Sequence, residues 1–261
     1  MKLFSTSKAY IAEGGGKRAA SRPTTAGKLA RHVLHHVLRN GMRRTASNGW
    51  RHVADRYREF RLGINTRGSI AGEVLGHGED SFGYQPIPYR TIDLALRSLA
   101  VDDFNTFVDF GCGKGRAVVA AGLWPFKRII GVERSAELCK IARQTVAQAR
   151  QRLRCPDIEI VEADARDYLP PDDVTVAFFF NPFDRDILLA VLERLRATRH
   201  QPPLPLKIIH GLPKCREDYL RSCAWLQTQC ELTTHLADWE QCTVYQATWQ
   251  ATAAVLKPAA K

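Results

Sequence analysis

The sequence has no long apolar run, no C-x-x-C pair and few acidic residues near its N-terminus. No segment approaches the roughly 18 apolar residues that a membrane span needs, and the N-terminus lacks the continuous apolar core of a secretory signal. The seven cysteines are odd in number and give neither a disulfide framework nor a zinc signature. We therefore expect a cytoplasmic protein in a reducing compartment, with no transmembrane segment and no metal site.

The scarcity of acidic residues is confined to the first part of the chain. Residues 1–61 contain 14 Lys and Arg against only Glu13, Asp55 and Glu59, whereas residues 62–261 contain 24 of each sign. This division predicts a basic N-terminal arm over residues 1–61 and an electrically balanced body. The first 27 residues have almost nothing to bury, so we expect no stable structure there.

Two segments of the arm have helical character. Residues 28–39 place apolar side chains at an amphipathic spacing with a basic rim, and residues 51–61 predict a second short basic helix. The arm could simply dock on the body, or contact an acidic partner, nucleic-acid phosphates or a membrane. An arm rich in arginine and poor in acids also resembles an organelle transit peptide, which would mean organelle import.

Residues 62–88 are rich in glycine and proline and have no sustained period, which is typical of a connector. Tyr84 and Tyr89 straddle Pro86 and Pro88 directly before the first helix of the body. A wall or lid over a cleft is therefore a plausible role for this connector.

From residue 89 to residue 250, buried strands alternate with helices, and a flexible tail follows at residues 251–261. The pattern predicts an α/β fold with a Rossmann-like, mostly parallel sheet whose terminal hairpin makes one edge antiparallel. The expected helices lie at 89–100, 136–153, 187–195 and 216–226. Two of the expected strands end at Asp109 and at Glu133. The other expected strands occupy residues 158–161, 174–180, 206–211, 230–236 and 242–249.

The most informative stretch runs from Thr106 to Glu133. A buried strand ends at Asp109, glycines follow at 111, 113 and 115, a helix begins, and a second buried strand ends on Glu133. This is a βαβ unit with a nucleotide-type crevice, in which the glycines allow the backbone to approach a ligand closely. Glu133 can then bind two ribose hydroxyls with its carboxylate oxygens.

The residues around the glycines decide between ligands. A dinucleotide site prefers a third glycine where Arg116 stands, and a Walker loop needs Ser or Thr where Gly115 follows Lys114. Asp109 places a carboxylate just before the glycines, which suits a positively charged ligand better than a pyrophosphate. With Asp164 after the third strand, three acids occupy successive strand ends.

These residues resemble the class I S-adenosylmethionine-dependent methyltransferases over roughly Tyr84 to Trp249, and in particular uncharacterised bacterial methyltransferase-domain proteins with the same DFGCGKGR motif. The resemblance implies a seven-stranded sheet with a reversed last strand and S-adenosyl-L-methionine across the strand ends. It assigns the methionine part of the cofactor to the glycine turn, the ribose to Glu133, and the adenine to Asp164 and Ala165. The implied cofactor-binding set is Asp109, Gly111, Cys112, Gly113, Glu133, Asp164 and Ala165.

The turn Asn181-Pro182-Phe183 is the candidate catalytic element. It resembles the Asn/Asp-Pro-Pro-aromatic motif of methyltransferases that act on amino or amide nitrogen, although the second proline is missing. The Asn181 side-chain oxygen can accept an N–H bond and orient a nitrogen lone pair, and Phe183 could pack against the target group. Asp184 and His210 are candidate bases for a cationic amine.

The sequence thus predicts an S-adenosylmethionine-dependent methyltransferase (EC 2.1.1.-) that N-methylates a protein or peptide side chain. The methyl acceptor is unknown, and protein is favoured over nucleic acid because the charge of the body is balanced. Three alternatives stay open. They are methylation of nucleic acid or a small molecule, a non-catalytic cofactor-binding module with a basic interaction arm, and a nicotinamide-dependent oxidoreductase.

Overall fold

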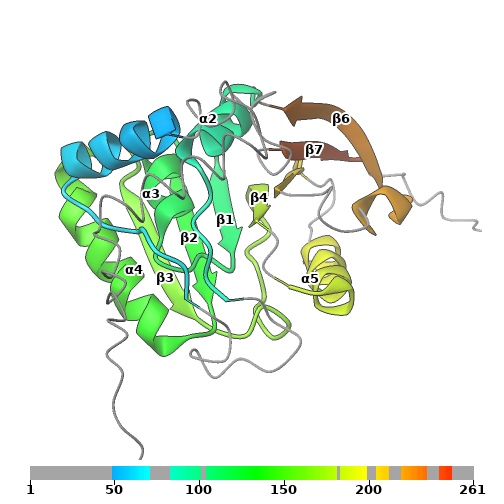
Figure 1. Ribbon diagram of the computed structural model, residues 1–261. Helices are drawn as coiled ribbons and strands as arrows, with labels where there is room; N and C mark the ends of the chain where they lie inside the picture. The colour runs from blue at the N-terminus through cyan, green and yellow to red at the C-terminus, as the bar shows by residue number, and fades with distance from the viewer. Residues whose placement is uncertain are drawn as a thin grey trace, which may run out of the picture. The chain divides into compact units, whose positions relative to one another are not determined.

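The computed structural model describes residues 49–70, 83–100, 104–180, 183–198, 204–211, 219–233 and 241–248 (Figure 1). The chain divides into two compact units, Met1–Thr45 and Ala46–Lys261, and every described residue belongs to the second unit. The helix expected over residues 28–39 lies outside the described residues. None of the helices in the described ranges is long and apolar enough to cross a membrane.

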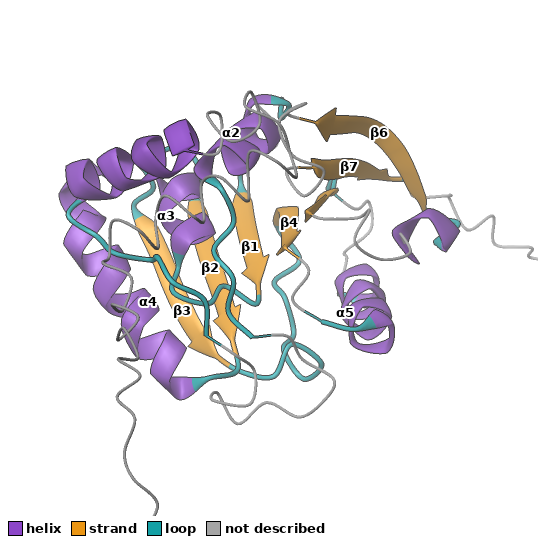
Figure 2. Cartoon of the chain, in the orientation of Figure 1, coloured by secondary structure: helices purple, strands orange, loops and turns teal. Residues whose placement is uncertain are grey.

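A seven-stranded sheet forms the centre of the second unit. Its spatial order is β3-β2-β1-β4-β5-β7-β6, and β7 runs antiparallel to both of its neighbours, whereas the other pairs are parallel (Figure 2). The predicted fold class is therefore confirmed. The strands are β1 (Thr106–Phe110), β2 (Arg128–Glu133), β3 (Asp157–Glu162), β4 (Val174–Phe180), β5 (Lys207–Gly211), β6 (Leu226–Thr233) and β7 (Gln241–Ala247).

Helices cover both faces of the sheet, with α3 and α4 on one side and α5 on the other (Figure 1). In β1, Phe107 packs into the core that includes α2, α3 and α4, and its neighbour Val108 packs into the core that includes α5. This alternation is the period of two of a strand buried on both faces. The elements are α2 (Tyr89–Arg97), α3 (Arg116–Gly122), α4 (Ala136–Ala149) and α5 (Arg185–Ala197), with short 3-10 turns at Arg150–Arg152 and Tyr219–Ser222.

The predicted short basic helix of the arm is present over residues 49–62 and belongs to the same unit as the sheet. Leu62 and Ile64 at its end pack against Val119 of α3 and Ala149 of α4. The boundaries predicted at residues 61 and 88 remain predictions.

One predicted element differs in kind. The helix expected over residues 216–226 is, in its described part, a 3-10 turn at Tyr219–Ser222 followed by the start of β6 at Leu226. Leu220 is fully buried against the α5 side of the sheet and Leu226 packs partly against it. The described part of this predicted helix therefore contains two separate elements that pack on the same core.

Candidate cofactor and active site

The glycine turn joins β1 to α3 at the carboxyl edge of the sheet. Gly111, Gly113 and Gly115 all have positive φ, at 78°, 55° and 80°, a region that side chains other than glycine rarely adopt. The backbone N–H groups of Gly111 and Cys112 donate to the carbonyl of Val132 in β2, at 2.8 and 3.0 Å. These bonds hold the turn over the end of β2, so the end of β1 and Glu133 lie beside each other.

Glu133 is buried at the end of β2, where two backbone groups bind its carboxylate. Oε2 accepts the N–H of Gly113 at 3.0 Å, and Oε1 accepts the N–H of Ser135 at 2.9 Å. Each carboxylate oxygen retains a further lone pair. The side chain is therefore held in one orientation and can still accept two hydroxyl groups, as ribose binding requires.

Asp109 is buried in β1, next to Gly131 of β2 in the strand register. Burial, and then the neighbouring Glu133 carboxylate, raise the pKa of Asp109 from an ordinary value of 3.8 to about 8. Two carboxyl groups close together in a dry site favour a cation between or beside them. This is the electrostatic condition that a sulfonium or an α-ammonium group would satisfy.

Cys112 lies between the glycines and is buried. Burial is the first cause that raises the pKa of its thiol, followed by the carboxyl groups of Asp109 and Glu133, so the thiol stays neutral. A Cβ on Gly131 would lie 2.9 Å from Cys112 Sγ. The absence of a side chain at residue 131 is thus what lets the turn sit directly on β2.

Asp164 follows β3 and is already bound to Arg166. The Arg166 backbone N–H and Nε donate to Oδ1 at 2.9 and 3.0 Å, and Nη2 donates to Oδ2 at 2.8 Å. These hydrogen bonds are the largest cause that lowers the pKa of Asp164. A carboxylate accepts about four hydrogen bonds, so Asp164 has room for about one more, such as an adenine amino group.

A single cavity brings most of the predicted site residues together. Its wall includes Asp109, Gly111, Cys112, Gly113, Glu133, Asp164, Ala165 and Phe183. Phe178, Phe180 and Ile187 add an apolar side next to Phe183. Asn181 and Pro182, the other two predicted catalytic residues, lie outside the described residues.

The two candidate bases have different environments. Asp184 is the N-cap of α5, where its carboxylate accepts the N–H of Ile187 at 3.1 Å. His210 is buried within β5 and does not line the cavity. Asp184 thus has a structural role as a helix cap, and neither residue gains support as a base.

The connector before α2 supplies a wall of the same cavity through residues 83–87. The Tyr84 ring lies against the glycine turn, since a Cβ on Gly113 would be 2.3 Å from Tyr84 Cδ2. The Tyr84 hydroxyl donates to the Thr66 carbonyl at 2.5 Å, and Lys114 Nζ lies 4.8 Å from the ring centroid. Of the two tyrosines, Tyr84 lines the cavity, whereas Tyr89 is a buried residue of α2.

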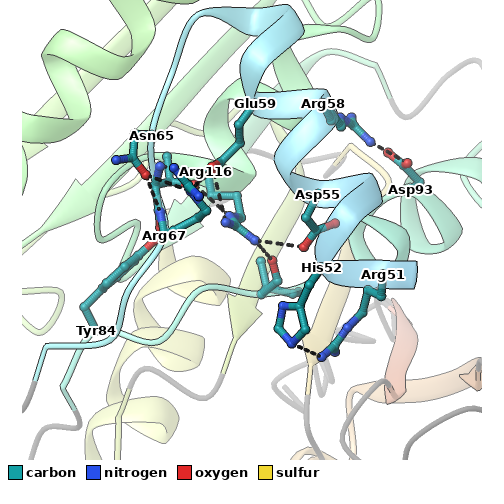
Figure 3. Close-up of polar contacts among 12 residues, drawn as sticks. Arg51, His52, Asp55, Arg58, Glu59, Asn65, Arg67, Tyr84, Asp93 and Arg116 are labelled. Atoms are coloured by element: carbon teal, nitrogen blue, oxygen red, sulfur yellow. Dashed lines mark hydrogen bonds and ion pairs between the residues drawn. The ribbon is translucent and has the colours of Figure 1, made fainter. Parts of the chain in front are cut away.

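Arg116, the first residue of α3, holds this connector and the helix of residues 49–62 against the glycine motif (Figure 3). Its guanidinium contacts Glu59 at 2.9 Å and Asp55 at 3.2 Å. It also donates to Thr66 Oγ1 at 2.7 Å and to the Ile87 carbonyl at 2.9 Å. Arg116 is only 4% exposed and Glu59 only 2%, so this is a buried ion pair with further hydrogen bonds.

Reasoning from the sequence missed these contacts of Arg116. It treated the residue as an obstacle to dinucleotide binding, whereas the side chain binds Glu59 and the Ile87 carbonyl in the preceding segments. A signal was present in the sequence, because Asp55 and Glu59 stand four apart on one helical face in an arm that is otherwise basic. Nothing in the local pattern indicated that their partner is a residue of the glycine motif.

Comparison with known proteins agrees with this architecture. Residues 107–199 match the family described as methyltransferase domain. The chain therefore contains a class I S-adenosylmethionine-dependent methyltransferase domain, and this domain implies S-adenosylmethionine as its cofactor. The acids described above fit that group, because Asp109 and Glu133 are both buried and a pair of neighbouring buried carboxyl groups favours a cation.

Among curated proteins, the chain is similar to trans-aconitate 2-methyltransferases. It is 34% identical to that of Azoarcus sp. (strain BH72) over 84 residues, which are 32% of this chain and 30% of the relative. It is 31% identical to the trans-aconitate 2-methyltransferase of Enterobacter sp. (strain 638) over 84 residues, which are again 32% of this chain and 30% of the relative. The chain thus spans about a third of the length of the curated relatives it matches.

Solved structures show distant likenesses. A ribosomal protein L11 methylase from Lactobacillus delbrueckii subsp. bulgaricus has a TM-score of 0.47 at 17% identity, covering 66% of this chain and 84% of that one. An RNA methyltransferase from Salinibacter ruber, in complex with S-adenosyl-L-homocysteine, has a TM-score of 0.45 at 21% identity, covering 63% and 93%. We draw no functional conclusion from these likenesses.

Proposed function

We propose that this protein is an S-adenosylmethionine-dependent methyltransferase that N-methylates a protein or peptide side chain. The observation that supports the cofactor is the cavity in which Asp109, Glu133 and the glycine turn meet. The observation that supports a nitrogen acceptor is the aromatic side of that cavity, which ends in Phe183 directly after Asn181 and Pro182.

In this proposal, different residues bind different parts of the cofactor. Asp109 attracts the positive charge of the cofactor, Glu133 accepts the ribose hydroxyls, and residues 83–87 close the glycine side against water. When bound, S-adenosylmethionine supplies a methyl group activated by its sulfonium. Holding an acceptor nitrogen in line with that methyl group can lower the barrier by about 7–11 kcal/mol, which is the usual range for fixed proximity and orientation.

Nitrogen becomes positively charged as the new N–C bond forms and the S–C bond breaks. Acceptors around the nitrogen therefore bind more strongly in the transition state than in the ground state. The side-chain oxygen of Asn181 is our candidate for such an acceptor. Phe183, which lines the cavity, would pack against the acceptor side chain and exclude water.

A polycarboxylate acceptor such as trans-aconitate has less support. Among the described residues, the arginines that line the cavity are Arg116 and Arg134. Arg116 is bound to Asp55 and Glu59, and Arg134 lies 3.9 Å from Asp164. An acid with several carboxylates needs cations that are not already neutralised, and of these two arginines only Arg134, which shares Asp164 with Arg166, retains part of its charge. The match to the trans-aconitate enzymes also covers only about a third of their length.

The first test is calorimetric titration with S-adenosylmethionine and S-adenosylhomocysteine. We expect saturable binding that Glu133→Ala abolishes. Glu162→Ala is the matched control, because Glu162 is the register partner of Glu133 on β3 but is exposed. If neither compound binds, or if both variants behave alike, the proposed cofactor site is wrong.

A second test identifies the acceptor. The protein is incubated with cell extract and S-adenosylmethionine carrying a tritiated methyl group, and the product is treated with protease, nuclease or alkali. Label that is released by protease and resists alkali supports N-methylated protein, because carboxyl methyl esters hydrolyse in alkali. Nuclease-sensitive or small-molecule label supports the corresponding alternative, and cofactor binding without transfer supports a non-catalytic module.

A further inference from the structure

The helix of residues 49–62 presents a row of hydrophobic side chains to solvent. Trp50, Val53, Tyr57 and Phe60 are 75%, 53%, 61% and 80% exposed. Their spacing of three, four and three residues places them on one stripe of the helix. We call these four residues the exposed seam. Among the described residues, the other large exposed hydrophobic side chains, Leu169 and Leu204, stand elsewhere in the chain.

The opposite face of this helix is held against the sheet-bearing unit. Asp55 and Glu59 bind Arg116, and Arg58 pairs with Asp93 of α2 at 2.6 Å (Figure 3). The helix therefore cannot rotate to bury its exposed seam without breaking a buried ion pair. A continuous apolar stripe that stays exposed in this way is typical of an interaction surface.

The charges beside the exposed seam are positive. If Trp50 and Tyr57 occupy a positions of a heptad and Val53 and Phe60 occupy d positions, Arg56 falls at g and Arg61 at e. Both arginines are exposed and flank the seam on its two sides. The acids of the helix, Asp55 and Glu59, lie on the far side, where Arg116 neutralises them.

A groove continues the exposed seam toward α2. It has a volume of about 620 Å³ and lies between the helix of residues 49–62 and α2. Trp50, Ala54 and Leu94 give it an apolar floor, and Arg90 and Arg97 stand among its lining residues. The acids among its described lining residues are paired, Asp55 with Arg116 and Asp93 with Arg58. The groove thus extends both the apolar and the basic character of the seam.

We propose that the exposed seam and this groove dock an amphipathic helix of a partner protein whose flanking positions carry Asp or Glu. The heptad spacing matches the ridge of an apolar helix, and the flanking arginines complement acids at its e and g positions. A second copy of this chain fits poorly, since Arg56 and Arg61 would face arginines in either orientation. Proteins that bind single-stranded nucleic acid stack its bases on separate aromatic side chains along a basic groove. Here Val53 lies between the aromatic side chains, so the surface is a continuous apolar stripe.

The test uses the full-length chain and two labelled three-heptad peptides with Leu at a and d. One peptide has Glu at every e and g position and the other has Lys, so like charges keep each from pairing with itself. Fluorescence anisotropy should show binding of the Glu peptide about tenfold or more tighter than binding of the Lys peptide. Phe60→Ser should weaken binding of the Glu peptide about tenfold, whereas Leu169→Ser, at a position elsewhere that is 66% exposed, should not.

Because the basic arm attracts any acidic peptide, the decisive variant is Arg56→Glu combined with Arg61→Glu. It should reverse the preference toward the Lys peptide. Absence of binding, equal affinity for the two peptides, or indifference to Phe60→Ser would overturn the proposal. So would a dimer that Phe60→Ser dissociates in sedimentation, or preferential binding of single-stranded RNA that the same variant weakens. S-adenosylmethionine binding serves as the folding control in every variant and is judged separately from docking.

Discussion

Gly113 and Tyr84 show how a single position shapes the cavity. The glycine was expected to leave room for a ligand, and its φ of 55° lies in the left-handed region that favours glycine. The space beside it is bounded by the Tyr84 ring, which comes from a different segment of the chain. The glycine therefore serves the fit of the connector wall as well as the approach of a cofactor.

We predict that Gly113→Ala abolishes S-adenosylmethionine binding, because its Cβ would lie 2.3 Å from the Tyr84 ring and displace the wall. Adding Tyr84→Ala should restore part of the affinity by removing the clash. The matched control is Gly68→Ala, which has a φ of 79° but nothing within 4 Å of the added Cβ. Gly68→Ala should lose only the stability that backbone strain costs, about 1–2 kcal/mol.

Calorimetric titration of the three variants measures the effect. Gly113→Ala with unchanged affinity would show that the turn and Tyr84 can separate freely. A double variant no better than the single one would place the damage in the backbone of the turn.

At the scale of elements, Arg116 links three segments that are distant in sequence. Its partners lie in the helix of residues 49–62 and at two points of the connector, Thr66 and Ile87. The acids Asp55 and Glu59 of that helix neutralise the charge of Arg116, and Tyr89 of α2 lies 4.7 Å beneath its guanidinium. The first turn of α3 thus organises the segments that precede the domain.

We predict that Arg116→Met lowers the free energy of unfolding by about 3 kcal/mol, the lower end of the range for a broken buried ion pair, because Glu59 loses Arg116 but keeps Arg67 at 3.2 Å. Arg116→Lys should lose less, since it keeps the charge but not the planar set of donors. Arg128→Met is the control, because its ion pairs with Asp157 and Glu159 are partly exposed and worth about 0–1 kcal/mol.

Urea denaturation gives the stability change, and hydrogen exchange shows where it acts. Arg116→Met should speed exchange in residues 49–62 and leave β1 and β4 protected. A loss no larger than that of Arg128→Met, or unchanged exchange in this helix, would contradict the anchoring role.

At the scale of the whole molecule, the sheet forces two acids together in a dry site. The parallel pairing of β1 with β2 brings Asp109 close to Glu133, and Asp109 is only 3% exposed. The fold therefore holds a proton on Asp109 that the unfolded chain would release.

This arrangement predicts how stability depends on pH. Between pH 3.8 and about 8, folded Asp109 is protonated while unfolded Asp109 is ionised, so its contribution to stability falls as pH rises through this window. Asp109→Asn keeps the neutral shape and should remove that loss. The Tm of the variant minus the Tm of the wild type should therefore grow with pH, in thermal unfolding without ligand.

Saturating S-adenosylmethionine should weaken the pH dependence of the wild-type Tm that Asp109 causes, since a nearby cation favours the ionised carboxylate. A Tm difference that stays constant from pH 4 to pH 8 would mean that Asp109 titrates normally.

Much of the fold was predictable because its signals are local. Buried strands such as Val174–Phe180 are continuous apolar runs in the sequence. The start of α4 is marked in the sequence by Ser135, an N-cap residue whose hydroxyl accepts the N–H of Leu138. The 3-10 turn at Tyr219–Ser222 was mistaken for a helix because burial of a few spaced apolar residues looks alike in both.

The sequence by itself determined the βαβ unit from Thr106 to Glu133, because a tight glycine turn and a right-handed crossover leave the ends of β1 and β2 no other place than side by side. Only the tertiary structure decided that β7 inserts between β5 and β6, that Arg166 occupies Asp164, and that Arg116 binds Asp55, 61 residues earlier. Those outcomes depend on which distant surfaces pack together and which charges must be neutralised when they do. A local pattern of residues does not contain that information.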